Sequence, residues 1–249
     1  FWAKDKMKWS ENLYKFMSRL HKREFEQHYA YVKNQSENVT KALLESGFSI
    51  PSDETKSLIS QVDLKSRFDN VDWDGEGASK YKPWMWYCEP KFDKDLVRLT
   101  TRIANDLSGY LCGLPVIQSA YFWKSRPCEG PSMGSQHWHI DNNDYRQIRC
   151  FVALNDIDEN NGAPEYISAA QSRKIYDEFE RMDKGNCRNK KRDHHELEKF
   201  LPETRRLCAT EGESYYLDVG NCYHRGSLNM LRERHIFVLQ FMTPFHIDS

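Results

Sequence analysis

Two short segments, far apart in the chain, carry side chains that can bind a metal ion. The first, Gln136-His-Trp-His-Ile-Asp141, contains His139 and Asp141, and the second contains His224. Two imidazoles and one carboxylate on one face of a metal suit Fe(II) and leave the remaining coordination positions open for reactants. The sequence therefore predicts that His139, Asp141 and His224 are the metal ligands and the catalytic residues.

The two-residue spacing of His139 and Asp141 has a structural requirement. In an extended strand, side chains at i and i+2 point to the same face, so both can reach one ion. In a helix they would be separated by about 200° around the axis. A lone His-x-Asp is common, but here a polar loop follows it and His224 precedes a final apolar strand. His137 shares a strand face with His139 and is the competing ligand.

A second candidate group is Arg234, at the start of the apolar run Arg234–Phe241. A strand that is apolar on both faces is expected to be buried, and a buried arginine needs an anionic partner. The planar guanidinium binds carboxylates through two parallel hydrogen bonds. We expect Arg234 to bind the far carboxylate of 2-oxoglutarate, with Arg225 and Arg232 as the alternatives and Arg232 placed in the preceding turn.

Composition limits the classes of function. The 249 residues are 39% hydrophobic and 29% charged, with a formal net charge of -1. This length supports a substantial core. The charge balance gives no reason to expect a nucleic-acid partner, and the longest apolar runs are too short to span a membrane. We therefore expect a small-molecule substrate as the partner, while the oligomeric state stays open.

The seven cysteines are scattered, and no two have the Cys-x-x-Cys spacing of a zinc ribbon. This usage fits reduced thiols in an intracellular protein, so we expect a cytoplasmic location. No signal-peptide-like segment opens the sequence as it stands. The sequence begins at Phe1 rather than at a methionine, so the natural start stays open.

Hydrophobic spacing predicts helices first and strands afterwards. Residues 1 to about 50 and about 93–111 have helical spacing, whereas residues 51–90 are less regular and are punctuated by prolines and glycines. Strands are expected at 116–124, 136–141, 147–155, 163–168, 213–219 and 233–244, with a charged helical insertion at about 171–205. The prediction is a mainly β protein with flanking helices, a double-stranded β-helix (jelly roll) with an N-terminal helical support. We expect a single domain over 1–249, with residues 1–114 as the support and 115–249 as the core.

Ordered motifs over roughly residues 115–245 resemble the phytanoyl-CoA dioxygenase family. They are the run from Gln136 to Ser168, with Ile148-Arg-Cys-Phe-Val-Ala-Leu-Asn-Asp-Ile-Asp-Glu-Asn-Asn-Gly162 inside it, then His224-Arg-Gly226 and the strand from Arg234 to Phe241. The resemblance implies a jelly roll that uses Fe(II), 2-oxoglutarate and O2.

By position, the resemblance makes His139, Asp141 and His224 the iron ligands and Arg234 the 2-oxoglutarate anchor. It adds Gln118 as a cosubstrate contact. A serine that the family often places two residues after the distal histidine is Gly226 here, with Ser227 one place later as the second cosubstrate contact. Halogenating relatives lack the carboxylate ligand, so its presence implies hydroxylation or a related oxidation.

Four residues are candidates for the substrate wall: Trp123, Tyr145, Arg146 and Arg149. Tyr145 and Arg146 follow the metal-binding loop, and Trp123 lies near the barrel mouth if its strand faces inward. A basic cluster at 184–192 could bind an acidic substrate such as a CoA thioester. Acidic residues follow it at once, however, so a solvated surface is the simpler interpretation.

The sequence thus predicts an Fe(II)/2-oxoglutarate-dependent dioxygenase that hydroxylates a small organic substrate and releases succinate and CO2. Two alternatives remain. One is a non-catalytic jelly-roll binding protein, which would have no need for the triad and Arg234 together. The other is a cupin-like metalloenzyme that does not use 2-oxoglutarate, which would gain if His137 were a ligand or Arg234 pointed away from the metal.

Overall fold

The computed structural model describes residues 37–75, 77–82, 84–127, 134–141, 143–144, 146–182, 197, 204–226 and 231–244. After a helix over residues 37–46, the elements run β1 (Phe48–Ser49), α3 (Asp53–Gln61), α4 (Leu64–Asp69), β2 (Ala78–Lys82), β3 (Met85–Cys88), α5 (Lys94–Leu111), β4 (Val116–Ser125), η1 (Gly134–Gln136), β5 (Gln147–Ala153), β6 (Glu165–Ile167), α6 (Ala169–Met182), β7 (Thr204–Arg206), β8 (Ser214–Asp218), β9 (His224–Arg225) and β10 (Arg234–Met242).

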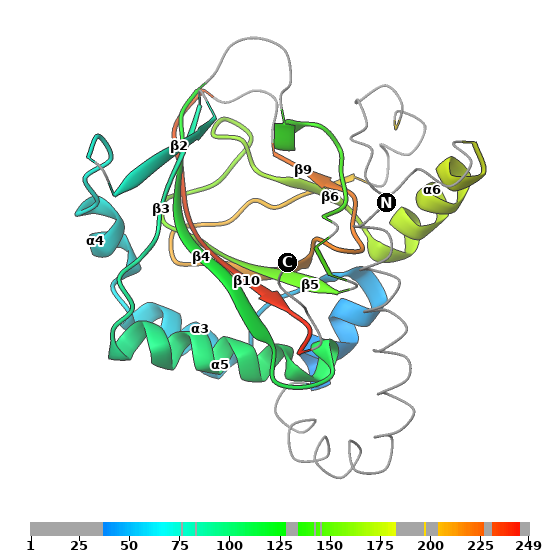
Figure 1. Ribbon diagram of the computed structural model, residues 1–249, viewed down its shortest axis with the longest axis horizontal. Coiled ribbons are helices and arrows are strands. Elements are labelled where there is room, and N and C mark those ends of the chain that lie inside the picture. The colour runs from blue at the N-terminus through cyan, green and yellow to red at the C-terminus, as the bar shows by residue number, and fades with distance from the viewer. Residues whose placement is uncertain are drawn as a thin grey trace.

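The strands form two antiparallel sheets that face each other (Figure 1). The larger has the order β1-β8-β5-β10-β4-β3-β2 and the smaller has the order β7-β6-β9. Side chains from both sheets meet in one core, where Tyr166 of β6 packs with Leu217 of β8 and Val238 of β10. This is the expected double-stranded β-helix with flanking helices, so the predicted fold class is confirmed.

The central strand β10 shows why the fold has three layers. Its side chains alternate between the two faces of the large sheet. Phe237 and Leu239 pack with the helices on the outer face, whereas Ile236 and Val238 pack between the sheets. Arg234 shares the inner face with Ile236 and Val238, because it lies two residues before Ile236.

The outer face of the large sheet is covered by α3 and α5 (Figure 1). Asp93 caps α5 by accepting hydrogen bonds from the backbone N–H groups of Asp95 and Leu96. The predicted apolar stripe of this helix is completely buried; its members are Leu96, Leu99, Ile103, Leu107 and Leu111. The helix expected at about 93–111 is confirmed, and it gives the sheet a rigid support.

Five predicted strands correspond to β4, β5, β6, β8 and β10, but one predicted strand was wrong. Residues 51–90, for which no helix or strand was predicted, form α3, α4 and the hairpin β2–β3, so the part before residue 115 contains strands as well as helices. Residues 136–141 do not form a regular strand. The helical turn η1 ends at Gln136, and His139 forms an isolated bridge with His224.

The structure describes only part of two predicted helical regions, residues 1–50 and 171–205. Within the expected helix over 1–50, residues 37–46 are helical and 1–36 lie outside the described residues. Within the expected insertion at 171–205, α6 accounts for the first part, and the basic cluster at 184–192 lies outside the described residues.

Among the described residues, no helix combines the length and the apolar character needed to cross a membrane. The five described cysteines, at positions 88, 112, 150, 208 and 222, are free thiols.

Candidate metal centre

Backbone hydrogen bonds bring the two ligand-bearing segments together. The N–H of His139 donates to the carbonyl of His224 at 3.1 Å, and the N–H of His224 donates to the carbonyl of His139 at 2.9 Å. The N–H of Asp141 donates to the carbonyl of Val219 at 2.8 Å. The expected extended geometry therefore holds at the site although no regular strand forms, because the second segment supplies the hydrogen-bond partners.

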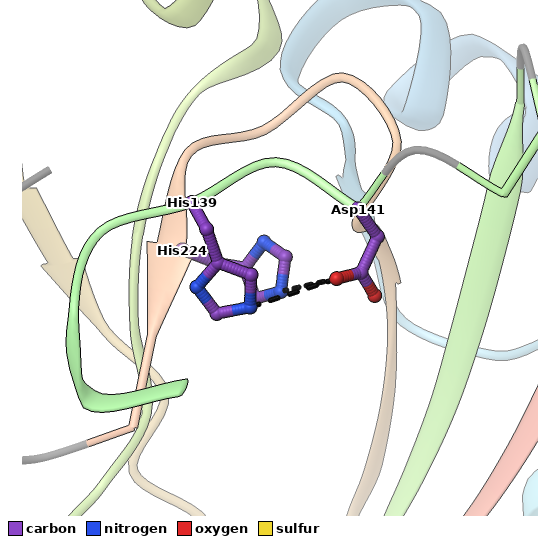
Figure 2. Close-up of side chains that lie close together, drawn as sticks. All are labelled: His139, Asp141 and His224. Atoms are coloured by element: carbon purple, nitrogen blue, oxygen red, sulfur yellow. Dashed lines mark ion pairs between the residues drawn. The ribbon is translucent and has the colours of Figure 1, made fainter. Parts of the chain in front are cut away.

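The three predicted ligands converge on one point (Figure 2). Oδ1 of Asp141 lies 3.5 Å from Nε2 of His139 and 4.0 Å from Nε2 of His224. One potential ligand atom from each residue lies within 4.8 Å of the other two. Metal–ligand bonds of about 2.1 Å fit a triangle of this size. Among the described residues, this is the one cluster of histidine, cysteine and acidic groups with metal-binding geometry, and His137 is not part of it.

Both imidazoles are held with Nε2 toward the cluster. Nδ1 of His139 lies 2.8 Å from the carbonyl of His137, and Nδ1 of His224 lies 3.0 Å from the carbonyl of Cys222. A carbonyl can only accept, so each Nδ1 carries the proton and each Nε2 keeps a lone pair. This is the tautomer that a metal-ligating histidine needs, with its orientation fixed by the second nitrogen.

His224 is held in its neutral form. Burial lowers the pKa of His224 to about 3, with a further contribution from His139, while Asp141 acts in the opposite direction. Its Nε2 atom is buried and has no hydrogen-bond partner among the described residues. A buried acceptor without a partner is costly, and a bound cation would satisfy it. The donor set of two imidazoles and one carboxylate fits Fe(II).

Arg149 of β5 holds the carboxylate ligand. Its Nη2 atom lies 2.6 Å from Oδ2 of Asp141, and its Nε donates to Oε1 of Gln240 at 3.2 Å. The sequence assigned Arg149 to the substrate wall. The structure does place it in the wall of the cavity beside the cluster, but its guanidinium is paired with a metal ligand.

Arg234 enters the same cavity from the start of β10 and is only 4% exposed. One Nη1 hydrogen bond goes to the carbonyl of Gly162, whereas Nε has no partner among the described residues. Burial lowers the pKa of Arg234 to about 10, so it remains a cation at neutral pH. The alternatives are already paired: Arg232 is exposed and bound to Asp158, and Arg225 is bound to Glu165.

A cavity of about 390 Å³ connects these groups. Its polar side is formed by the three metal-binding residues, the three arginines and Gln240, and most of the rest is apolar or aromatic. The lining residues are Trp84, Met85, Tyr87, Tyr121, Trp123, Ser135, His139, Asp141, Arg149, Phe151, Pro164, His224, Arg225, Gly226, Arg234, Ile236 and Gln240. The site thus combines a group of three potential metal ligands, a buried arginine and a largely apolar lining.

The other predicted site residues divide into three groups. Trp123 lines the cavity, as expected. Gln118 does not reach it: it is exposed, at the β-bulge where the registers of β4 and β10 shift. Arg146 does not reach it either, because its guanidinium stacks on the Tyr110 ring and donates to the Tyr110 carbonyl at 2.6 Å. Tyr145 and Ser227 lie outside the described residues.

Sequence reasoning missed much of the apolar wall. Trp84, Met85 and Tyr87 come from the β3 region, which the sequence analysis left without regular structure. Tyr121 comes from β4, two residues before the predicted Trp123. The concentration of aromatic residues at 84–87 was the available signal, and inward alternation along β4 would have added Tyr121.

Solved structures with the same fold resemble this one. SnoN, a non-haem α-ketoglutarate-dependent epimerase from nogalamycin biosynthesis, gives a TM-score of 0.54 at 14% identity over 88% of this chain and 87% of its own. SnoK, a carbocyclase from the same biosynthesis, gives 0.53 at 14% identity over 85% of each chain. HygX from Streptomyces hygroscopicus, solved with nickel and 2-oxoglutarate bound, gives 0.52 at 13% identity over 84% of this chain and 87% of its own. No protein-family model and no curated protein sequence matches the chain.

Proposed function

We propose that this protein is an Fe(II)/2-oxoglutarate-dependent dioxygenase, formed by one domain over 1–249, that hydroxylates a small organic substrate. One observation carries the proposal: a two-histidine, one-carboxylate cluster shares a cavity with a buried arginine that has no carboxylate partner among the described residues. The cluster suits Fe(II), and the arginine suits the distal carboxylate of 2-oxoglutarate. HygX, with the same fold, was solved with nickel and 2-oxoglutarate bound.

The proposed reaction consumes one 2-oxoglutarate and one O2. One oxygen atom enters the new carboxylate of succinate, CO2 leaves, and the second oxygen atom converts a substrate C–H into C–OH. Bound Fe(II) with 2-oxoglutarate supplies the activation of O2. His139, Asp141 and His224 would hold the iron, and Arg234 would fix the 5-carboxylate of 2-oxoglutarate.

The remaining residues of the site would position the reactants and exclude water. The backbone carbonyls of His137 and Cys222 fix the two imidazole rings, and Arg149 fixes the Asp141 carboxylate. The aromatic wall gives the substrate a dry surface, which strengthens the electrostatic contacts within the site.

The finer assignment is to the phytanoyl-CoA dioxygenase family, on the ordered motifs from Gln136 to Phe241. SnoN is an epimerase and SnoK is a carbocyclase, so the fold supports more than one outcome of oxidation. The carboxylate ligand Asp141 favours hydroxylation, because no coordination position is left for a halide.

The cupin-like alternative loses support. Cupins commonly use three histidines and a glutamate, whereas the cluster contains no further histidine or glutamate among the described residues. Arg234 also lines the metal cavity, which that alternative did not require.

Turnover of 2-oxoglutarate tests the proposal. Purified protein with Fe(II), O2 and 2-oxoglutarate should form succinate slowly without substrate, and Asp141→Asn should abolish this reaction. Arg232→Gln is the matched control, because Arg232 is exposed and lies outside the cavity wall. Succinate formation that is independent of Fe(II), or equal in the Asp141→Asn protein, would contradict the proposal.

A further inference from the structure

Aromatic rings form a large part of the cavity lining. Four come from β3, β4 and the residue before β3: Trp84, Tyr87, Tyr121 and Trp123. The rings of Tyr87 and Tyr121 meet edge to face, with centroids 5.0 Å apart. Such flat apolar surfaces favour a partner that is itself flat and apolar.

The arginines of the cavity leave no cation for an acidic substrate. Arg149 is paired with Asp141 at 2.6 Å, and Arg225 donates from Nε to Glu165 at 2.7 Å. Under the proposed function, Arg234 is occupied by 2-oxoglutarate. Among the described lining residues no lysine is present, so an anionic substrate would be buried without a partner, which is strongly unfavourable.

A cationic substrate is also disfavoured. Asp141 is the only acidic residue among the described lining residues, and it is engaged by Arg149 and by the proposed metal. The face of Trp123 is already approached by the Arg149 guanidinium, 5.6 Å from the ring centroid. A second cation at that face would meet the positive charge of Arg149 and of the metal.

We infer that the substrate is a neutral, flat, ring-bearing molecule that packs against the aromatic side chains of the cavity. This inference rests on the proposed function, because it assigns Arg234 to 2-oxoglutarate. It predicts that a molecule with a charge inside the cavity binds poorly, because the charged residues among the described lining residues are already engaged.

Three naphthalene probes of different charge test the inference on the wild-type protein. They are 2-acetylnaphthalene, which is neutral, 2-naphthoate, which is anionic, and 2-naphthyltrimethylammonium, which is cationic. Calorimetric titration is done without O2, with Fe(II) and saturating 2-oxoglutarate. The neutral ketone should bind at least about tenfold more tightly than either ion, because burying an unpaired charge is unfavourable. Tighter binding of either ion, or binding of none of the three, would overturn the inference.

The visible band of the Fe(II)–2-oxoglutarate chelate is recorded on the same samples. It distinguishes failure of the inferred substrate class from failure of the proposed function. A band together with preferred binding of an ion overturns the substrate class and leaves the proposed function standing. Without a band, the proposed function fails and the inference fails with it.

Discussion

The guanidinium of Arg149 and the carboxylate of Asp141 form an ion pair in which the two carboxylate oxygens have different partners. Oδ2 lies 2.6 Å from Nη2 of Arg149, whereas Oδ1 faces His139 at 3.5 Å and His224 at 4.0 Å. Arg149 therefore leaves Oδ1 as the carboxylate oxygen that faces the two imidazoles. Under the proposed function, Asp141 would bind the iron through this one oxygen.

Replacing Arg149 should weaken metal binding although Arg149 is not a ligand. In Arg149→Gln the Asp141 carboxylate loses its orienting partner, and we expect the affinity for Fe(II) to fall roughly tenfold or more, as is typical when such outer contacts are removed. Anaerobic Fe(II) titration measures this. Arg232→Gln, an exposed arginine paired with Asp158, should behave as the wild type. Unchanged affinity in Arg149→Gln would show that Asp141 is oriented by other contacts.

Arg234 should be unfavourable for stability and necessary for cosubstrate binding. Its lowered pKa shows that the folded protein disfavours the buried cation. Arg234→Met should therefore raise the free energy of unfolding of the metal-free protein by about 1–3 kcal/mol, while 2-oxoglutarate should no longer stabilise the metal-loaded protein. Chemical denaturation with and without 2-oxoglutarate measures both effects. A destabilised variant that still responds to 2-oxoglutarate would contradict this role.

The metal-free protein should lose stability as the pH falls below 6.5. His224 has a pKa of about 3 when folded and near its ordinary 6.5 when unfolded. Below 6.5 the unfolded chain takes up a proton that the folded protein refuses, so unfolding becomes easier until the pH reaches about 3. Between pH 7 and pH 4 this amounts to a loss on the order of 3 kcal/mol.

Denaturation series at several pH values, with His224→Gln as the comparison, isolate this contribution. The variant lacks the titrating group, so its stability should fall less steeply over the same pH range. Equal slopes in both proteins would show that His224 does not resist protonation in the folded state.

Asp218 should support the metal site from outside it. Its Oδ1 atom accepts from the backbone N–H groups of Gly220 at 3.0 Å and Asn221 at 3.1 Å, which shapes the turn that leads to His224. The same turn supplies the Val219 carbonyl to Asp141. Asp218→Ala should lower the free energy of unfolding by about 2–3 kcal/mol and also weaken Fe(II) binding. Asp69→Ala, a surface change, should alter neither, and intact Fe(II) affinity in Asp218→Ala would contradict the link.

The convergence of His139 and Asp141 and the burial of Arg234 could be predicted because both depend on local rules. Side chains two residues apart share a face of an extended segment, which brings His139 and Asp141 together. The alternation along β10 places Arg234 on the face between the sheets, with Ile236 and Val238. Burying a cation on that face is unfavourable unless an anion pairs with it, and this holds in any fold.

The ion pair of Arg149 and the wrong placement of Gln118 could not be derived in this way. Arg149 of β5 meets Asp141 through a tertiary contact, and sequence spacing does not encode that contact. Gln118 was assigned from strand position, but a bulge shifts the register between β4 and β10 at that point. The aromatic wall depends on β3 pairing with β4, a contact between segments that hydrophobic periodicity does not report.

The measurement that tests the central claim most directly is an anaerobic titration of the protein with Fe(II), with and without 2-oxoglutarate. We expect a weak visible metal-to-ligand charge-transfer band when both are present, lost in His139→Ala and, at moderate 2-oxoglutarate, in Arg234→Met. Iron binding without a band would contradict the use of 2-oxoglutarate. Absence of both iron and 2-oxoglutarate binding in a folded protein would mean that this jelly roll is a binding protein and not an oxygenase.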